Sequence, residues 1–239
     1  MDPASRRRPH WFQRNVKLAS PMERRERRRD ILGIGLVLLL VAAGTLPELV
    51  LLGADHGLWG SLVWRAWTYQ HGAFWAGLLQ DWRPLYDGQI WLMFLTHGLL
   101  HADSLHMAMN MVTLLSLGLP LVRRLGAGRF LAIHAASQLG GGLGFGLLGP
   151  LTQPMVGASG ALFGLAAAWI VVLREEAAGE GVWADLRLVV APTLFLILLN
   201  AVMYAANAGQ LAWEAHLGGF LAGALVTLLL LPRASAPRR

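Results

Sequence analysis

Six long apolar segments constrain the fold of this chain more than any other feature. Each approaches the length of about 20 apolar residues that a helix needs to cross a bilayer. Only 14% of the 239 residues are charged, whereas soluble domains carry about 25%. The sequence therefore predicts an all-α membrane protein of one domain, residues 31–232, with six transmembrane helices. These are expected near residues 31–53, 97–122, 129–149, 155–173, 186–206 and 213–231.

The basic residues predict how these helices are oriented. Ten of the 20 Lys and Arg residues precede residue 30. Eight more follow the second, fourth and sixth segments, at Arg123, Arg124, Arg129, Arg174, Arg187, Arg233, Arg238 and Arg239. Cytoplasmic loops carry an excess of positive charge, so both termini are expected in the cytoplasm. We interpret residues 1–30 as a mobile basic tail that faces anionic lipid rather than nucleic acid, and 233–239 as a second basic tail.

The first apolar segment could also belong to a signal peptide, with small residues at 41–44 for cleavage. Its apolar run is longer than the usual 7–15 residues or so of a signal peptide, which favours an uncleaved anchor helix. The compact form favours a bacterial cytoplasmic (inner) membrane, with an organelle membrane as the alternative. The chain has no cysteine, which excludes disulfides, thiolate metal sites and cysteine nucleophiles.

The connection between the first two segments, residues 54–96, is rich in aromatic side chains. Trp and Tyr prefer the headgroup level of a bilayer, so we expect short helices that lie in the outer interface. A cap packed on the bundle is compatible with this interpretation. The connection holds six of the ten tryptophans: Trp59, Trp64, Trp67, Trp75, Trp82 and Trp91.

A serine and a histidine interrupt two of the apolar segments. Ser159 lies between Gly157 and Gly160 near the start of the fourth segment, and helix packing alone would explain this short run. His216 lies at the same depth in the sixth segment, and an imidazole can activate a serine hydroxyl. Glu214 is two residues from His216 and points elsewhere on a helix. The pair therefore predicts a Ser-His dyad without a carboxylate.

Small residues recur every four positions on the same two segments. Such stripes let membrane helices approach closely. If the two stripes face each other, Ser159 and His216 come within hydrogen-bond reach. The stripes are Gly160, Gly164 and Ala168 on one segment, and Ala215, Gly219 and Gly223 on the other.

The second segment carries three histidines and an asparagine. His106 and Asn110 are four residues apart and share a helix face, from which both could donate hydrogen bonds to an oxyanion. A metal site formed with Asp103 is the alternative, but on one helix His106 would lie about 140° from the face that His97 and His101 share. A proton path would need acidic residues that the other segments lack. We expect no metal and no other cofactor.

Three short motifs lie in three different segments. They are His-x4-His-x3-Asn at residues 101–110, Gly-x-Ser-Gly at 157–160, and Ala-His-x2-Gly-x3-Gly at 215–223. With this order and topology, the chain resembles the rhomboid family of intramembrane serine proteases over roughly residues 31–231. The resemblance implies a six-helix rhomboid bundle and a serine endopeptidase that cleaves single-span membrane proteins.

The resemblance also implies roles for individual residues. Ser159 would be the nucleophile and His216 the general base. His106, Asn110 and the Ser159 N–H would stabilise the oxyanion. The supporting residues would be His101, Gly157, Gly160, Phe163 and Gly219, with the Phe163 ring stacked on the imidazole.

The first loop departs from the family's pattern. The family's Trp-Arg pair in the first loop is out of register, because Trp91 is followed by Leu92. The fifth span, with Pro192 and Asn200, would be a mobile gate for substrate entry. A catalytically silent rhomboid-like protein that binds client helices is the alternative function, whereas a transporter lacks support from internal repeats.

Overall fold

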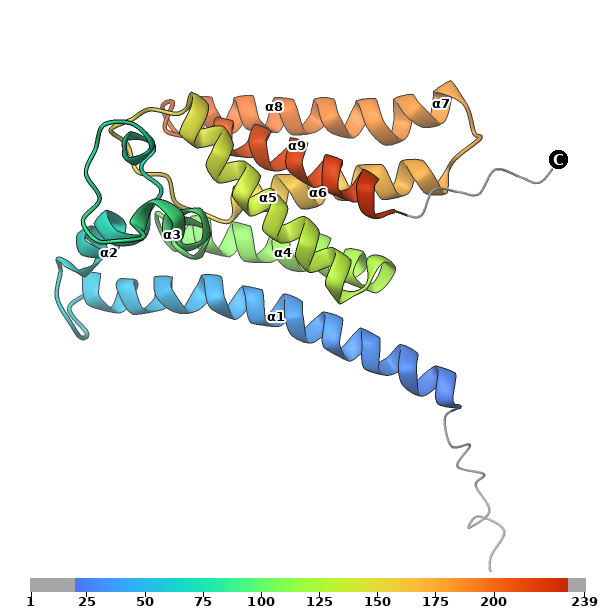
Figure 1. The fold of residues 1–239 in the computed structure, drawn as a ribbon, viewed down its shortest axis with the longest axis horizontal. Helices are drawn as coiled ribbons and strands as arrows, with labels where there is room; N and C mark the ends of the chain where they lie inside the picture. The colour runs from blue at the N-terminus through green and yellow to red at the C-terminus, as the bar shows by residue number, and fades with distance from the viewer. Residues whose placement is uncertain (1–19, 232–239) are drawn as a thin grey trace, which may run out of the picture.

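The structure, a computed structural model, describes residues 20–231, and these residues form helices joined by short connections (Figure 1). The described residues contain no β-strand, only one isolated bridge between Phe74 and Met155. The terminal segments 1–19 and 232–239 lie outside the described residues, as does most of what we predicted for the two tails. The long helices are α1 (Pro21–Asp55), α4 (Ser104–Leu125), α5 (Ala127–Leu148), α6 (Ser159–Glu176), α8 (Ala191–Ala206) and α9 (Trp213–Leu230).

Five helices of the described chain are long and apolar enough to cross a membrane, so the chain is an all-helical, multi-pass membrane protein. They cover Met22–Asp55, Ser104–Leu125, Ala127–Leu148, Val182–Ala206 and Trp213–Leu230. The remaining predicted segment forms α6, whose 18 residues end in Arg174, Glu175 and Glu176. Because α6 has only these 18 residues, the three charges leave it without a continuous apolar stretch as long as those of the other five, although half of its residues are buried in the bundle.

Two helices begin far from the residues at which their segments were predicted to begin. The first begins at Pro21 rather than near residue 31, because Ser20 and Glu23 form a capping box there. Residues 21–30 are therefore helical and continuous with the apolar part of α1. The second segment becomes helix α4 only at Ser104, since the Asp103 carboxylate accepts the His106 N–H at 2.8 Å and caps the helix. His97 and His101 consequently lie before α4, not on it.

Three consecutive elements make up the fifth apolar segment. They are α7 (Val182–Asp185), a π-helical turn η4 (Leu186–Val190) and α8. Pro192 directly follows the π-helical turn η4, and membrane helices tolerate proline where such a local π adjustment satisfies the freed backbone groups. Arg174 on α6 forms an ion pair with Asp185 on α7, which attaches this end of the segment to the bundle.

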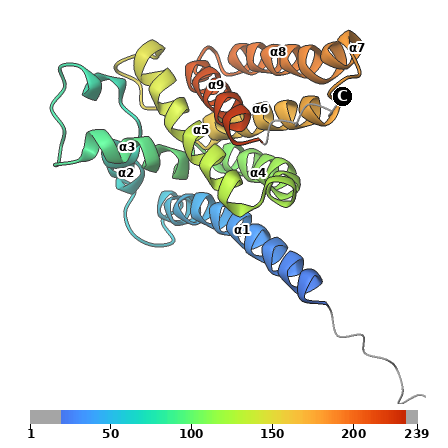
Figure 2. The same ribbon diagram turned by 45° about the vertical axis from the view of Figure 1, so that its right-hand side comes forward.

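The glycine stripes of α6 and α9 face each other, which is the condition under which Ser159 and His216 were expected to meet. A Cβ atom built on Gly219 would overlap the carbonyl oxygen of Gly160, and one on Gly223 would overlap that of Gly164. Both views in Figures 1 and 2 show α9 beside α5 and α6. The backbones of α6 and α9 are therefore in direct contact, which only glycine permits at these positions.

The first connection folds into short helices at the end of the bundle where α6 and α9 begin (Figure 1). Five of its six tryptophans are exposed, and Trp75 is half-buried. An antiparallel bridge joins Phe74 of this connection to Met155, through two N–H···O bonds of 2.9 Å. The short elements are α2 (Trp64–Gly72), η2 (Ala76–Leu79), α3 (Gln89–Thr96) and η3 (His97–Leu99).

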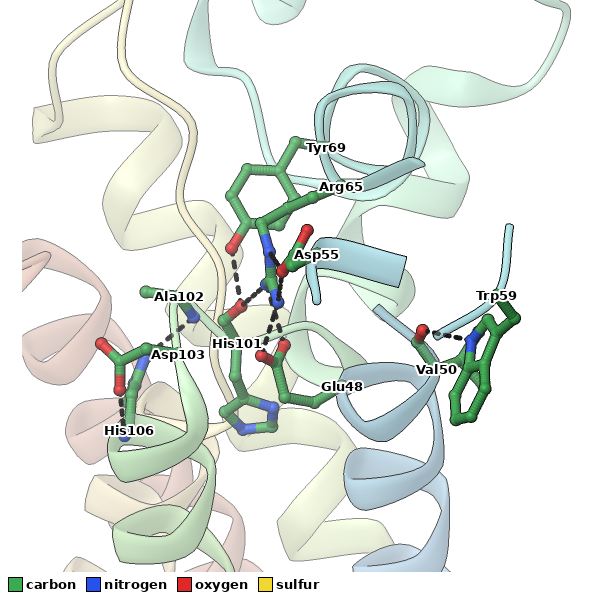
Figure 3. A network of polar contacts seen from close by, with 10 residues as sticks. All are labelled: Glu48, Val50, Asp55, Trp59, Arg65, Tyr69, His101, Ala102, Asp103 and His106. Atoms are coloured by element: carbon green, nitrogen blue, oxygen red, sulfur yellow. Dashed lines mark hydrogen bonds and ion pairs between the residues drawn. The ribbon is translucent and has the colours of Figure 1, made fainter. Parts of the chain in front are cut away.

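A charged cluster ties α1, α2 and the segment before α4 together (Figure 3). Arg65 donates to both carboxylate oxygens of Glu48, at 2.8 and 3.1 Å, and to Asp55 at 2.7 Å. The carbonyl oxygen of His101 accepts from the Arg65 guanidinium at 3.2 Å and from the Tyr69 hydroxyl at 2.6 Å. The cluster therefore holds the chain directly before α4 against α1 and α2.

The protonation states in this cluster favour the same contacts. The hydrogen bonds to Glu48 raise the pKa of Arg65 above its already high ordinary value. Burial raises the pKa of the Tyr69 phenol, so this group stays a neutral donor at neutral pH. Glu48 is fully buried while Arg65 is only partly so, and a buried carboxylate is costly when its partner is removed.

We predict that Gly219→Ala destabilises the protein, because the added methyl group forces the α6 and α9 backbones apart. Overpacking of this kind costs about 1–3 kcal/mol. Unfolding of the purified protein in detergent measures the loss. Gly35→Ala is the matched control, since a Cβ at Gly35 meets nothing within 4 Å. Equal stability of the two variants would contradict the close contact.

We predict that Arg65→Leu destabilises the protein by about 3–5 kcal/mol, because it leaves the buried Glu48 carboxylate without its partner. Adding Glu48→Leu to that variant should restore much of the loss, since no unpaired charge then remains. Thermal melts in detergent compare the two variants with wild type. Arg83→Leu is the control on the same connection, at an exposed position. A double variant no more stable than Arg65→Leu alone would count against the proposed cause.

Candidate catalytic site

Ser159 is the first residue of α6, and the loop before it is fixed at two points. The Phe74–Met155 bridge holds one point, and the Gly157 N–H donates to the His97 carbonyl at 2.9 Å to form the other. Gly157 has a φ of 123°, a conformation that favours glycine. The first N–H groups of a helix have no acceptor within the helix, so those of α6 are available beside the Ser159 hydroxyl.

The Ser159 hydroxyl and the His216 imidazole are in hydrogen-bond contact. Ser159 Oγ lies 2.8 Å from His216 Nε2, although 57 residues separate them in the chain. The contact follows from the α6–α9 interface, because a Cβ on Gly160 would approach the Ala215 carbonyl to 3.1 Å. Gly160, which follows Ser159, and Ala215, which precedes His216, therefore leave little room between them for a side chain.

A third polar group contacts the other nitrogen of the imidazole. Asn200 Oδ1, on α8, lies 2.6 Å from His216 Nδ1. Among the described residues, no carboxylate forms a hydrogen bond with this ring. Sequence reasoning named Asn200 only as part of a gate and missed this contact. The signal was present, since Asn200 is a lone amide in an apolar helix, and such groups are usually functional.

The Phe163 ring covers one face of the His216 imidazole. The ring centroids are 4.2 Å apart and the planes are inclined by 6°. Phe163 lies one turn after Ser159 on α6, so the same helix presents the hydroxyl and the stacking ring. The imidazole is thereby confined by Phe163 on its face and by Ser159 and Asn200 on its two nitrogens.

His106 and Asn110 both approach Gly157, two residues before the serine. A Cβ at Gly157 would lie 2.9 Å from His106 Nε2 and 3.7 Å from Asn110 Nδ2. Asn110 Nδ2 is buried and has no hydrogen-bond partner among the described residues. Two side chains of α4 therefore direct nitrogen atoms to the start of α6, and one of these is a buried donor without an acceptor.

The Ala102 N–H lies 3.4 Å from His106 Nδ1, which makes Nδ1 the acceptor and leaves the proton on Nε2. This N–H belongs to the same peptide unit as the His101 carbonyl that Arg65 and Tyr69 hold (Figure 3). The charged cluster on the first connection therefore fixes the peptide that orients His106.

His101 and His97 have separate surroundings. The His101 ring is buried and packs edge-on against His106, with 5.3 Å between centroids. His97 is buried in η3, where Nδ1 lies 2.7 Å from the Met93 carbonyl and Nε2 lies 2.8 Å from the Gln138 amide. Within residues 20–231, no three His, Asp or Glu side chains are close enough to hold a metal ion.

These groups together have the chemistry of acyl transfer. A hydroxyl contacts an imidazole nitrogen, and a buried amide, a second imidazole and a helix N-terminus lie on the neighbouring side. Such an arrangement can deprotonate a serine and stabilise negative charge on an oxygen. The supporting glycines Gly157, Gly160 and Gly219 are the positions where the backbone must approach closely.

Comparison with known proteins agrees with this arrangement. Residues 87–233 match the Rhomboid domain. The putative rhomboid protease YdcA of Bacillus subtilis (strain 168) is 31% identical over 141 residues, which cover 58% of this chain and 67% of the relative. The rhomboid protease GluP of the same strain is 32% identical over 152 residues, which cover 61% of this chain and 27% of the relative.

A plant relative extends the comparison beyond bacteria. RHOMBOID-like protein 5 of Arabidopsis thaliana is 34% identical over 136 residues, which cover 56% of this chain and 42% of the relative. The chain thus spans less than half the length of two of these three relatives. The matched domain nevertheless includes more than half of the chain, together with Ser159, His216, His106 and Asn110. This protein belongs to the rhomboid family.

Proposed function

We propose that this protein is an intramembrane serine endopeptidase, with Ser159 as nucleophile and His216 as general base. The observation that carries the proposal is the 2.8 Å contact between Ser159 Oγ and His216 Nε2 at the start of α6. The buried Asn110 amide, which lacks a partner within the described residues, supports the same reaction. Membership of a family that includes relatives named as proteases supports it further.

In the proposed reaction, His216 Nε2 takes the hydroxyl proton while Ser159 Oγ attacks the scissile carbonyl carbon. The resulting oxyanion accepts hydrogen bonds from Asn110 Nδ2, His106 Nε2–H and the Ser159 N–H. The protonated imidazole then gives its proton to the leaving amine as the C–N bond breaks. Water then attacks the acyl-serine ester while His216 Nε2 accepts a proton from it. As the ester C–Oγ bond breaks, His216 returns this proton to Ser159 Oγ, which releases the acid product and restores the free serine.

We further propose a setting for this reaction in the membrane. The six predicted segments, with α6 as the fourth, form six spans, and the distribution of basic residues directs both termini to the cytoplasm. The dyad then lies near the outer face of a bacterial cytoplasmic membrane. The exposed tryptophans of the first connection lie at the headgroup level beside it. Single-span membrane proteins are the proposed substrates.

We predict that Ser159→Ala and His216→Ala each lower cleavage of a labelled transmembrane substrate by about 10³-fold or more, because the two groups act as a unit. Purified enzyme in proteoliposomes provides the assay. Ser116→Ala is the control, since this exposed hydroxyl donates only to the Val112 carbonyl. A fluorophosphonate should label wild type and Ser116→Ala but not Ser159→Ala. Cleavage by Ser159→Ala at the wild-type rate would refute Ser159 as the nucleophile. A wild-type protein that neither cleaves the substrate nor is labelled would favour the catalytically silent alternative.

We predict that Asn110→Ala lowers kcat by about 10²–10³-fold with little change in KM, because the amide stabilises charge that develops only in the transition state. Steady-state kinetics on the same substrate measures both constants. A rise in KM at unchanged kcat would instead assign Asn110 to substrate binding.

A further inference from the structure

We propose that Asn200 is a positioning residue of the catalytic site, which fixes the tautomer and orientation of His216 through a neutral hydrogen bond from α8. The inference rests on the proposed serine-protease function and adds a third member to the dyad. It follows from the chain of contacts that runs from Asn200 Oδ1 to His216 Nδ1, at 2.6 Å, and from His216 Nε2 to Ser159 Oγ, at 2.8 Å.

The direction of these hydrogen bonds determines where the imidazole proton lies. An amide oxygen only accepts, so the contact with Asn200 Oδ1 requires a proton on His216 Nδ1. In a neutral imidazole, Nε2 then carries the lone pair. That lone pair faces the Ser159 hydroxyl, which is the arrangement a general base needs. The opposite tautomer would place a proton between Nε2 and the hydroxyl and would prevent its activation.

Other candidates for this role in the described chain do not hydrogen-bond to Nδ1 of the ring. Glu214 is buried on the same helix, but its Oε2 has no hydrogen-bond partner and it does not bond to His216. Phe163 restrains the plane of the imidazole, but a stacked ring does not determine which nitrogen carries the proton. Only Asn200, among the residues that the structure describes, distinguishes Nδ1 from Nε2 on the side away from the serine.

The helix that carries Asn200 is weakly packed. No residue of α8 is buried, whereas α6 and α9 both contribute several buried residues to the bundle. In the described chain, the Asn200–His216 contact is the one side-chain hydrogen bond that joins α8 to another long helix. The proposed positioning bond therefore connects the general base to the least buried of the six long helices.

Two variants of Asn200 and a control directly after α8 test the proposal. Asn200→Leu removes the acceptor at similar size, and Asn200→Asp keeps an oxygen at the same position. We expect Asn200→Leu to lower kcat by about 10–100-fold, as loss of an orienting partner does elsewhere, with KM unchanged. Asn200→Asp should retain most of the activity. Asn207→Leu is the matched control, because this exposed amide donates to the Met203 carbonyl of α8. Asn200→Ala replaces the leucine variant if that variant does not fold.

A spectroscopic measurement separates positioning from general damage to the structure. The ¹⁵N shifts of labelled histidine report the tautomer directly, and the His216 signals are assigned by their absence in His216→Ala. We expect a proton on Nδ1 in wild type and in the Asn207→Leu control. Asn200→Leu should populate the Nε2–H tautomer.

The outcomes are distinct for the two proposals. Wild-type kcat in Asn200→Leu, an unchanged tautomer in that variant, or an Asn200→Asp variant as inactive as Asn200→Leu would each overturn the role of Asn200. Undiminished cleavage by Ser159→Ala would overturn the proposed function instead. The tautomer measurement does not depend on catalysis, so it still decides whether Asn200 fixes the imidazole.

Discussion

The backbone contact between α6 and α9 is the constraint on which the rest of the candidate site depends. Gly160 and Gly219 lie so close that a methyl group on Gly219 would overlap the neighbouring carbonyl. In a membrane, helices gain little from burying apolar surface against each other, and association depends on close packing. Here that packing brings the first turns of two helices together. A hydroxyl on one and an imidazole on the other then meet at 2.8 Å without a long, flexible side chain.

A second constraint acts from the side of the first connection. The buried Glu48 and the partly buried Arg65 form an ion pair, and Arg65 also holds the His101 carbonyl. The N–H of the same peptide unit approaches His106. Buried ion pairs add little net stability, but they tolerate few alternative arrangements because an unpaired charge is so costly. The pair thus favours one geometry for the chain before α4. This geometry in turn positions His106 and Asn110 of α4 beside the start of α6.

Much of this arrangement could be predicted from the sequence, for identifiable reasons. The apolar segments correspond to helices because the bilayer fixes their length. The stripes of small residues at 160–168 and 215–223 indicated close helix packing, and they would bring Ser159 and His216 together if they faced each other. The predicted start of α1 was wrong because hydropathy marks only where the apolar run begins. The helix itself begins at the capping box of Ser20, ahead of the charged residues. The predicted start of α4 was wrong because the helix begins where the Asp103 side chain caps it, and hydropathy does not indicate such a local hydrogen bond. The Arg65 cluster joins residues distant in sequence, so no local pattern could indicate it.

Asn200 is a neutral partner for the histidine Nδ1, at the place where many serine proteases have a carboxylate. Within a bilayer an isolated carboxylate is expensive, whereas an amide oxygen directs a hydrogen bond without carrying a charge. The amide stabilises an imidazolium less, so its main effect is on the tautomer. A neutral hydrogen bond contributes about 0.5–1.5 kcal/mol. The contacts that a substrate helix makes with α8 could therefore replace the Asn200–His216 bond. Since α8 has no buried residue to hold it, the orientation of the base depends on where α8 lies.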